Sequence, residues 1–207
     1  MTAPVLRVSA ETLARACALL RAGGIVAFPT ETYYGLAVDP FNQVALQRLF
    51  KLKARPESKP VLTLVRDRTQ IPRLAVATPA PYDSLMRQYW PGPLTLIFPA
   101  RLDLPSELTG GTGGIGIRQS PNPVANRLLD AWGGPLTATS CNRSGQAPTS
   151  SARQAAQLLT AHEGLVLDDG LTPGGSGSTV VDLREGQLIC LRDGKIPFAL
   201  IQHAAAQ

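Results

Sequence analysis

The sequence has few of the residues that mark several common classes of protein. Its 207 residues include only three cysteines and two histidines, and charged residues make up 17%. The cysteines are far apart and form no CxxC pair, which argues against a disulfide framework and a structural zinc site. No apolar run approaches the ~20 residues of a membrane span, and the N-terminus lacks the apolar segment of a signal peptide. We therefore expect a cytoplasmic protein without membrane association.

The composition is otherwise that of a folded domain. Hydrophobic residues make up 44% of the chain, enough for a substantial core. The length fits one large domain, and we expect a single domain over residues 1–207. The net charge of +5 and a pI near 9.4 permit contact with RNA but do not require it.

Helix and strand patterns alternate along most of the chain. Apolar spacing and capping residues predict helices at 10–21, 43–53, 81–89, 123–132 and 151–160. Short apolar runs predict strands at 25–28, 61–65, 94–98, 115–118, 135–139 and 165–167, with a hairpin at 178–183 and 188–191. This alternation predicts an α/β fold, with a mixed sheet because of the terminal hairpin.

Polar loops follow several of the predicted strands, at 30–35, 118–121 and 140–150. In open α/β sheets, loops beyond the strand ends form the ligand crevice. These loops are rich in Thr, Ser, Asn and Arg and contain no histidine, which favours binding and electrostatic stabilisation over acid–base relay. The two histidines, His162 and His203, lie far from these loops and are interpreted as surface residues.

A basic cluster lies between a predicted helix and a predicted buried strand. Its four cations are Lys51, Lys53, Arg55 and Lys59. Such a cluster at one edge of the fold suits a polyanion such as triphosphate, with arginine as a bidentate fork and lysine as a point charge. The alternative is a solvated helix end that is favoured by the helix dipole.

Three further polar residues follow strands. Ser140 and Asn142 alternate just after a strand and so could both face a ligand, or they could serve turn and capping roles. Arg118 ends an alternating strand and is interpreted either as the partner of a carboxylate or as a surface residue. The segment 110–114 is glycine-rich, but it resembles neither a Walker A loop nor a dinucleotide fingerprint.

Seven blocks of sequence together resemble the YrdC/TsaC family, the threonylcarbamoyl-AMP synthases. The blocks are PTETYYGL at 29–36, LKARP at 52–56, WPGPLT at 90–95, IR at 117–118, TSCNRSG at 139–145, STVVD at 178–182 and LRDG at 191–194. The family signature pairs Lys-x-Arg with a later Ser-x-Asn, matched here by Lys53/Arg55 and Ser140/Asn142. The resemblance extends from about residue 10 to residue 194.

The resemblance implies a twisted open mixed sheet with helices on its faces and a large basic cavity, in the short single-domain form. It implies a nucleotidyltransferase that joins L-threonine, bicarbonate or CO2, and ATP into threonylcarbamoyl-AMP and pyrophosphate. Mg²⁺ is expected to enter with ATP, without assigned protein ligands. The product would pass to tRNA threonylcarbamoyltransferase proteins in the threonylcarbamoyladenosine modification of tRNA.

The resemblance also implies roles for individual residues. Those expected on the ATP side are Lys53, Arg55, Lys59, Asn142, Ser150 and Arg192, of which Lys53 and Arg55 are expected to be catalytic. Those expected to contact threonine are Thr32, Arg118, Ser140 and Ser178. The sequence departs from the family pattern at two places. Leu64 stands where longer relatives have a threonine-contacting histidine. In the segment after Asn142, the residue that contacts the nucleotide is either Thr149 or Ser150.

Two other functions are compatible with parts of the sequence. One is a paralogue of the same fold that mainly binds RNA or ribosomal particles, which the basic pI would suit. The presence of Thr32 and of both signature pairs argues against it. The other is a carbamoyl-phosphate-using relative from hydrogenase maturation, whose zinc-finger and acylphosphatase domains are missing from these residues.

Overall fold

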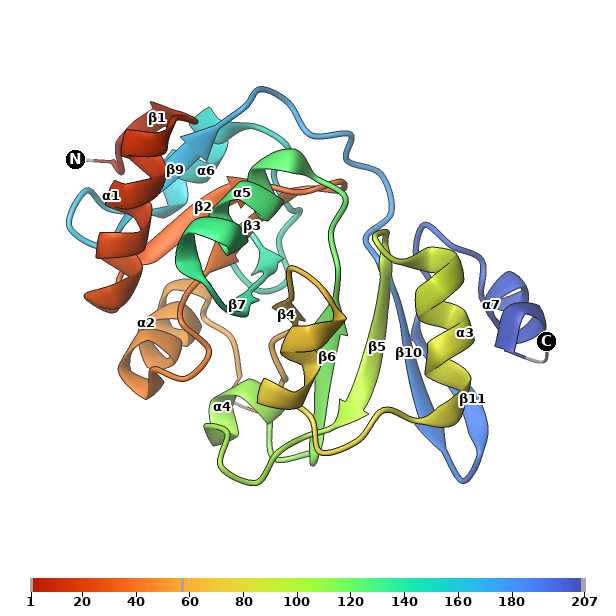
Figure 1. Ribbon diagram of the computed structural model, residues 1–207. Coiled ribbons are helices and arrows are strands. Elements are labelled where there is room, and N and C mark those ends of the chain that lie inside the picture. Colours follow the sequence, from red (N-terminus) through yellow and green to blue (C-terminus); the bar gives the residue numbers. More distant parts are fainter. Residues whose placement is uncertain (1, 57, 206–207) are drawn as a thin grey trace.

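The computed structural model describes residues 2–56 and 58–205, which form two mixed β-sheets standing side by side (Figure 1). In this part of the chain, one sheet has five strands, in the spatial order β1 (Val5–Arg7), β9 (Gly164–Asp168), β2 (Ile25–Pro29), β3 (Tyr34–Ala37) and β8 (Thr139–Ser140). The other has six, in the order β11 (Gln187–Arg192), β10 (Thr179–Arg184), β5 (Leu94–Pro99), β6 (Gly114–Arg118), β4 (Thr63–Leu64) and β7 (Leu136–Thr137). Both sheets contain parallel and antiparallel pairs.

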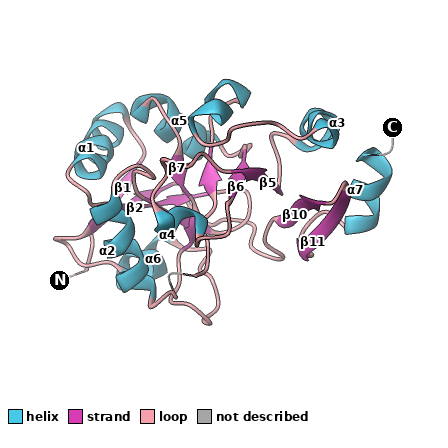
Figure 2. Ribbon diagram, turned by 90° about the horizontal axis from the view of Figure 1, so that it is seen from below, coloured by secondary structure: helices cyan, strands magenta, loops and turns pink. Residues whose placement is uncertain are grey.

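Helices cover the outer faces of the sheets. Their bounds are α1 (Ala10–Arg21), α2 (Gln43–Lys53), α3 (Ala80–Tyr89), α4 (Ser106–Thr109), α5 (Pro123–Trp132), α6 (Ala152–Leu158) and α7 (Phe198–Ala205), with a 3₁₀ helix at Arg68–Arg73. Helices α1 and α5 pack on each other and on β2, while α3 and α7 form a separate pair beside the C-terminal hairpin (Figures 1 and 2). The two termini lie on opposite sides of the molecule (Figure 1).

Local sequence signals account for the first helices. The Ser9 hydroxyl accepts a hydrogen bond from Thr12 N at 3.1 Å, and the Thr12 hydroxyl accepts one from Ser9 N at 2.8 Å, which forms a capping box. Asn42 caps α2 in the same manner, through Ala45 N. One face of α1 is buried against α5 and β2, as its apolar spacing predicts. Within the described residues, no helix combines the length and apolar character needed to cross a membrane.

Helix α2 ends in a turn that redirects the basic cluster. Ala54 adopts a left-handed conformation with φ of 47°, and Arg55 N donates to Phe50 O at 3.0 Å. With the bond from Ala54 N to Lys51 O, this is a Schellman motif. The turn separates Lys53, which stays on the buried face of the helix, from Arg55, which points away from the helix axis.

The predicted mixed α/β fold is confirmed, but several predicted elements differ. Strand β3 was missed, because the predicted polar loop over 29–35 continues into Tyr34–Ala37, which pairs antiparallel with β2 and is buried throughout. The strand predicted at 135–139 is divided between β7 and β8, which belong to different sheets. The chain therefore crosses from one sheet to the other at Ala138, and it brings Ser140 between them.

Candidate functional site

A hollow lies where the two sheets meet. Segments from both sheets and from the connecting loops line it, with side chains from Thr32, Arg55, Arg118, Ser140, Ser178 and Arg192 among them. It encloses about 140 Å³, or about 640 Å³ when the open mouth is included, which suits a small-molecule site. Six of the ten predicted site residues thus lie around one cavity, although they come from distant parts of the sequence.

Buried hydroxyl groups form two pairs around the hollow. The hydroxyls of Thr30 and Thr32 are 3.1 Å apart in the loop after β2, and those of Thr95 and Ser178 are 2.9 Å apart on the other sheet. Thr32 and Ser178 are 6% and 4% exposed. Hydroxyls can both donate and accept, so these pairs can bond to the carboxylate, amine or hydroxyl of a small polar ligand.

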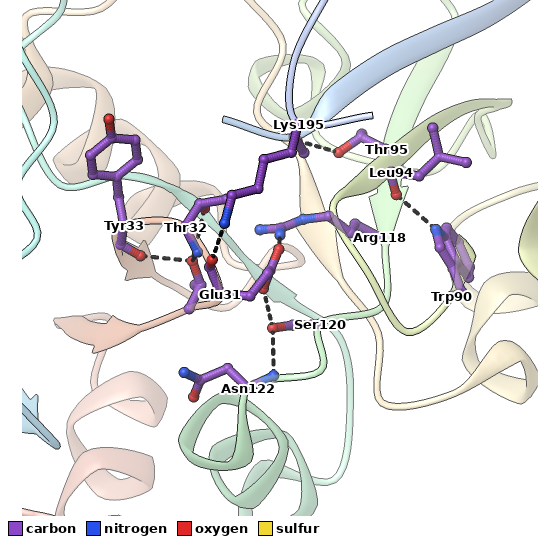
Figure 3. A network of polar contacts seen from close by, with 12 residues as sticks. Glu31, Thr32, Tyr33, Trp90, Leu94, Thr95, Arg118, Ser120, Asn122 and Lys195 are labelled. Carbon is purple, nitrogen blue, oxygen red and sulfur yellow. Dashed lines mark hydrogen bonds and ion pairs between the residues drawn. The ribbon is translucent and has the colours of Figure 1, made fainter. Parts of the chain in front are cut away.

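A buried ion pair joins Arg118 at the end of β6 to Glu31 in the loop after β2 (Figure 3). The Ser120 hydroxyl donates to Glu31 Oε2 at 2.5 Å, and Lys195 Nζ donates to the Glu31 backbone carbonyl at 3.2 Å. The prediction of a carboxylate partner for Arg118 is confirmed within the chain itself. Arg118 also lines the hollow, and its buried Nε has no hydrogen-bond partner among the described residues.

Two more arginines face the same hollow. Arg55 donates to the carbonyls of Lys59 and Pro60, and Arg192 donates from Nε and Nη2 to the carbonyl and hydroxyl of Ser178, both at 2.9 Å. Burial and the like charge of Arg192 lower the pKa of Arg55, and they lower that of Arg118 to about 10. All three guanidinium groups remain protonated at neutral pH, so the hollow gathers positive charge and favours an anion.

Lys53 is not among the residues that line the hollow. Its ammonium lies on the buried face of α2 and donates to the carbonyls of Ser140 and Asn142 and to Asn142 Oδ1. Burial and the charge of Arg55 lower the pKa of Lys53 to about 8. The two halves of the predicted signature are therefore in direct contact, and Lys53 fixes the backbone that carries Ser140.

The remaining predicted nucleotide residues are not among those that line the hollow. Asn142 and Thr149 line a second hollow next to the first, with Asn142 Nδ2 donating to Gln146 O at 2.5 Å. Ser150 is half-buried, and its carbonyl accepts from Thr172 N at 2.9 Å. Lys59 is exposed beside Arg55. The structure thus does not bring Lys59, Asn142 and Ser150 into the main hollow.

The loop after β9 closes one side of the site. Gly174 N donates to Thr32 O at 2.7 Å, and the Tyr33 hydroxyl donates to Gly175 O. The Tyr34 hydroxyl donates to Gly170 O at 2.8 Å. These bonds fasten the loop to the segment that carries Thr32.

Sequence reasoning missed two features of the hollow. Glu31 was overlooked as a site residue, although it lies directly beside Thr32 in a polar loop that follows a buried strand. Leu62 lines the hollow, whereas Leu64 belongs to the hydrophobic core between α1, α5 and β2. The position of Glu31 beside Thr32 was the available signal, but its pairing with Arg118 depended on the tertiary fold.

The donors around the hollow determine how a metal ion could be held. Among the described residues, no group of three or more His, Cys, Asp or Glu side chains is arranged to bind a metal, and the side chains that line the hollow include no carboxylate. Mg²⁺ prefers oxygen ligands and keeps several waters. The described residues around the hollow therefore supply no carboxylate ligand for a magnesium ion.

Comparisons with known proteins identify relatives of this chain. The family model Sua5_yciO_yrdC, described as telomere recombination, matches residues 18–194. A threonylcarbamoyl-AMP synthase of Thiobacillus denitrificans is 38% identical over 173 residues, which cover 83% of this chain and 91% of the relative. One of Pyrococcus abyssi is 34% identical over 187 residues, which cover 90% of this chain and 55% of the relative.

A solved structure extends the comparison to three dimensions. The crystal structure of Pyrococcus abyssi Sua5 complexed with L-threonine superposes with a TM-score of 0.90 at 32% identity, and the match covers 98% of this chain and 60% of that one. The chain therefore spans a little over half the length of the Pyrococcus relative and most of the length of the Thiobacillus relative.

Proposed function

The chain belongs to the Sua5/YciO/YrdC family, and we propose that it is a threonylcarbamoyl-AMP synthase built as a single YrdC-like domain. Its substrates are L-threonine, bicarbonate or CO2, and ATP, and its products are threonylcarbamoyl-AMP and pyrophosphate. The observation that carries the proposal is the convergence of Arg55, Arg118 and Arg192 with buried hydroxyls around one hollow. The related Pyrococcus structure contains L-threonine, which supports the same amino acid as substrate here.

The residues around the hollow suit both substrates. Arg118, with its unpartnered Nε, and the hydroxyls of Thr32 and Ser178 bind the threonine carboxylate and its polar atoms. Arg55 and Arg192 bind the ATP phosphates, and Ser140 lines the same hollow and contacts threonine. Lys53 acts by positioning the backbone at Ser140. The prediction that Lys59, Asn142 and Ser150 contact the nucleotide remains part of this proposal.

The reaction needs positioning and charge neutralisation more than a dedicated base. The threonine amine adds to CO2 and loses a proton to water, which gives a carbamate. A carbamate oxygen then attacks the α-phosphorus of ATP, and the bond to the bridging oxygen breaks so that pyrophosphate leaves. The guanidiniums of Arg55 and Arg192 stabilise the negative charge of the phosphates, as nucleotidyl transfer requires. Mg²⁺, when bound to ATP, adds further neutralisation.

Other parts of the proposal concern the cellular setting. Substrates of this kind place the enzyme in the cytoplasm, and the product passes to tRNA threonylcarbamoyltransferase proteins. Direct contact with tRNA is a further prediction, favoured by the net charge of +5. A protein that only binds RNA has no need for Arg118 and Thr32, which are 4% and 6% exposed and which an RNA backbone on the surface does not reach.

A direct assay tests the proposal. The purified protein is incubated with ATP, bicarbonate and threonine, and pyrophosphate is measured with and without threonine. We expect threonine-dependent release that an Arg55→Ala variant largely loses. Release that is no greater than in the Arg55→Ala control rejects the synthase, and salt-sensitive RNA binding without ATP turnover supports the RNA-binding alternative.

A further inference from the structure

The Glu31 carboxylate lies behind one of the three arginines that face the hollow. The side chains of Arg118 and Glu31 are 5% and 13% exposed, and the Ser120 hydroxyl holds the second carboxylate oxygen at 2.5 Å (Figure 3). Lys195 bonds to the backbone of Glu31 and not to its carboxylate. Glu31 is not among the residues that line the hollow, whereas Arg118 is.

The other two arginines of the hollow are held differently. Arg55 bonds to two backbone carbonyls, and Arg192 bonds to the carbonyl and hydroxyl of Ser178. These partners orient the guanidinium groups but carry no formal charge. Within residues 2–56 and 58–205, neither arginine forms an ion pair with a carboxylate. Among these described residues the charge of Arg118 is therefore balanced by a carboxylate, whereas the partners of Arg55 and Arg192 are neutral.

This difference affects which anion each end prefers. An amino acid is a zwitterion, so its carboxylate needs directional donors but brings no net charge to be neutralised. A pyrophosphate or triphosphate carries several negative charges, and it is repelled by a fixed carboxylate close to the arginine that would bind it. An arginine that pairs with a glutamate through one nitrogen keeps its other N–H donors, while the nearby carboxylate discriminates against polyanions.

We propose that Glu31 is a specificity-determining residue, which makes the Arg118 end of the hollow select an amino-acid carboxylate over a phosphate. Glu31 acts through Arg118 and does not touch the substrate. The inference rests on the proposed function, since it requires that one site hold an amino acid and a nucleotide together. It explains how a hollow with three arginines keeps ATP and pyrophosphate from occupying the threonine position.

A binding experiment with the full chain tests this. Glu31→Gln keeps the shape of the side chain and removes its charge. Dissociation constants for L-threonine and for pyrophosphate are measured by calorimetry for the wild type and the variant. We expect the preference for threonine over pyrophosphate at the Arg118 end to fall about tenfold or more. Pyrophosphate should also become a competitor of threonine in the variant, while in the wild type it competes with ATP.

Glu107→Gln is the matched control. Glu107 is also a buried glutamate, but it lies on α4 and bonds to Gln43 and Gln47 away from the hollow. We expect this variant to leave the ratio of the two dissociation constants unchanged. A folded Glu31→Gln protein in which both constants change equally, or neither changes, overturns the inference and leaves Glu31 with a purely structural role.

A second variant covers the case in which Glu31→Gln does not fold. Glu31→Asp keeps the charge but withdraws it from Arg118 by one methylene, so we expect a smaller shift in the same direction, and no shift overturns the inference. Failure of the proposed function can be distinguished from failure of the Glu31 inference, because binding is measured without turnover. A wild type that binds neither threonine nor pyrophosphate contradicts the proposed function, whereas a wild type that binds both with an unaltered preference in the variants contradicts only the role of Glu31.

Discussion

The ammonium of Lys53 donates a hydrogen bond to the backbone carbonyl of Asn142 at 2.7 Å, across 89 positions of sequence. It also bonds to the carbonyl of Ser140, and Ser144 N returns a bond to Lys53 O at 2.7 Å. The end of α2 and the loop after β8 are thereby joined into one unit. Lys53 thus supports the wall of the hollow from behind, while Arg55, two residues later, faces into it.

Replacing Lys53 should abolish most of the activity. Lys53→Met fills a similar volume but donates no hydrogen bonds, so the carbonyls of Ser140 and Asn142 lose their buried partner. We expect threonine-dependent pyrophosphate release to fall on the order of 10²-fold, as misplacement of a positioned site typically causes. Lys51→Met, on the exposed side of the same helix, is the control and should stay near wild type. Near-normal activity in Lys53→Met contradicts the prediction.

The pH dependence of stability should reveal the same lysine. The pKa of Lys53 is lowered from its ordinary 10.5 to about 8 in the folded protein. Between these values the unfolded chain binds more protons than the folded one, so the contribution of Lys53 to the free energy of unfolding rises with pH. Below pH 8 both states are protonated, and this contribution is constant.

The measurement compares wild type with Lys53→Met by denaturant titration at pH 7, 8, 9 and 10. We expect the difference between their free energies of unfolding to shift in favour of the wild type above pH 8, by at most about 1.4 kcal/mol per pH unit. The comparison cancels other titrating groups that do not interact with Lys53. Cys141 does interact with Lys53, and burial raises its pKa to about 12, so both proteins carry Cys141→Ala. A difference independent of pH would show that Lys53 titrates normally.

Removal of Arg118 should destabilise the fold as well as the site. Arg118→Met leaves the Glu31 carboxylate in a buried position without its counter-charge, which typically costs about 3–5 kcal/mol. The double variant with Glu31→Gln should recover most of this loss. Arg66→Met, which breaks the exposed pair with Asp130, should cost about 1 kcal/mol or less. If Arg118→Met and Arg66→Met lose equal free energies of unfolding, the description of Arg118 and Glu31 as a buried ion pair is contradicted.

Arg192 should affect ATP more than threonine. Arg192→Ala removes one of the two hollow arginines that form no ion pair within the described residues, so we expect the KM for ATP to rise about tenfold or more with a smaller change in the KM for threonine. Arg184→Ala lies on the same hairpin but pairs with Asp182 on the surface, and it should leave both constants unchanged. The KM values are measured by steady-state kinetics with each substrate varied in turn. A rise in the KM for threonine alone would assign Arg192 to threonine and not to ATP.

In the glycine-rich segment 110–114, substitution by alanine should destabilise the protein more at Gly110 than at Gly111. Gly110 has φ of 60°, and a Cβ there would lie 2.8 Å from Ser58 O and 2.9 Å from Pro60 N. Gly111 has φ of 70° but no atom within 4 Å of such a Cβ. We expect Gly110→Ala to cost about 1–3 kcal/mol more than Gly111→Ala, as measured by thermal unfolding. Since Pro60 lines the hollow, only Gly110→Ala should also reduce activity.

Local signals were sufficient for much of the secondary structure. The start of α1 at Ala10 and the start of α2 after Asn42 were predicted correctly, because capping side chains bond to the backbone within a few residues. The hairpin turn at Glu185 and Gly186 was also correct, and both residues have positive φ, as such a turn requires. Strand β3 was missed because it is buried on both faces and so shows no alternation.

The sequence by itself determined the family, the mixed α/β fold and the residue types of the site, because these depend on motifs and on patterns within a few residues. Only the tertiary structure decided which of those residues share a cavity. It placed Arg55 and Arg192 in the hollow, turned Lys53 toward the carbonyls behind it, and paired Arg118 with Glu31. These contacts join strands and loops that are far apart in the chain. Their geometry is fixed by how the two sheets meet and by the need of each buried charge for a partner, and neither is encoded locally.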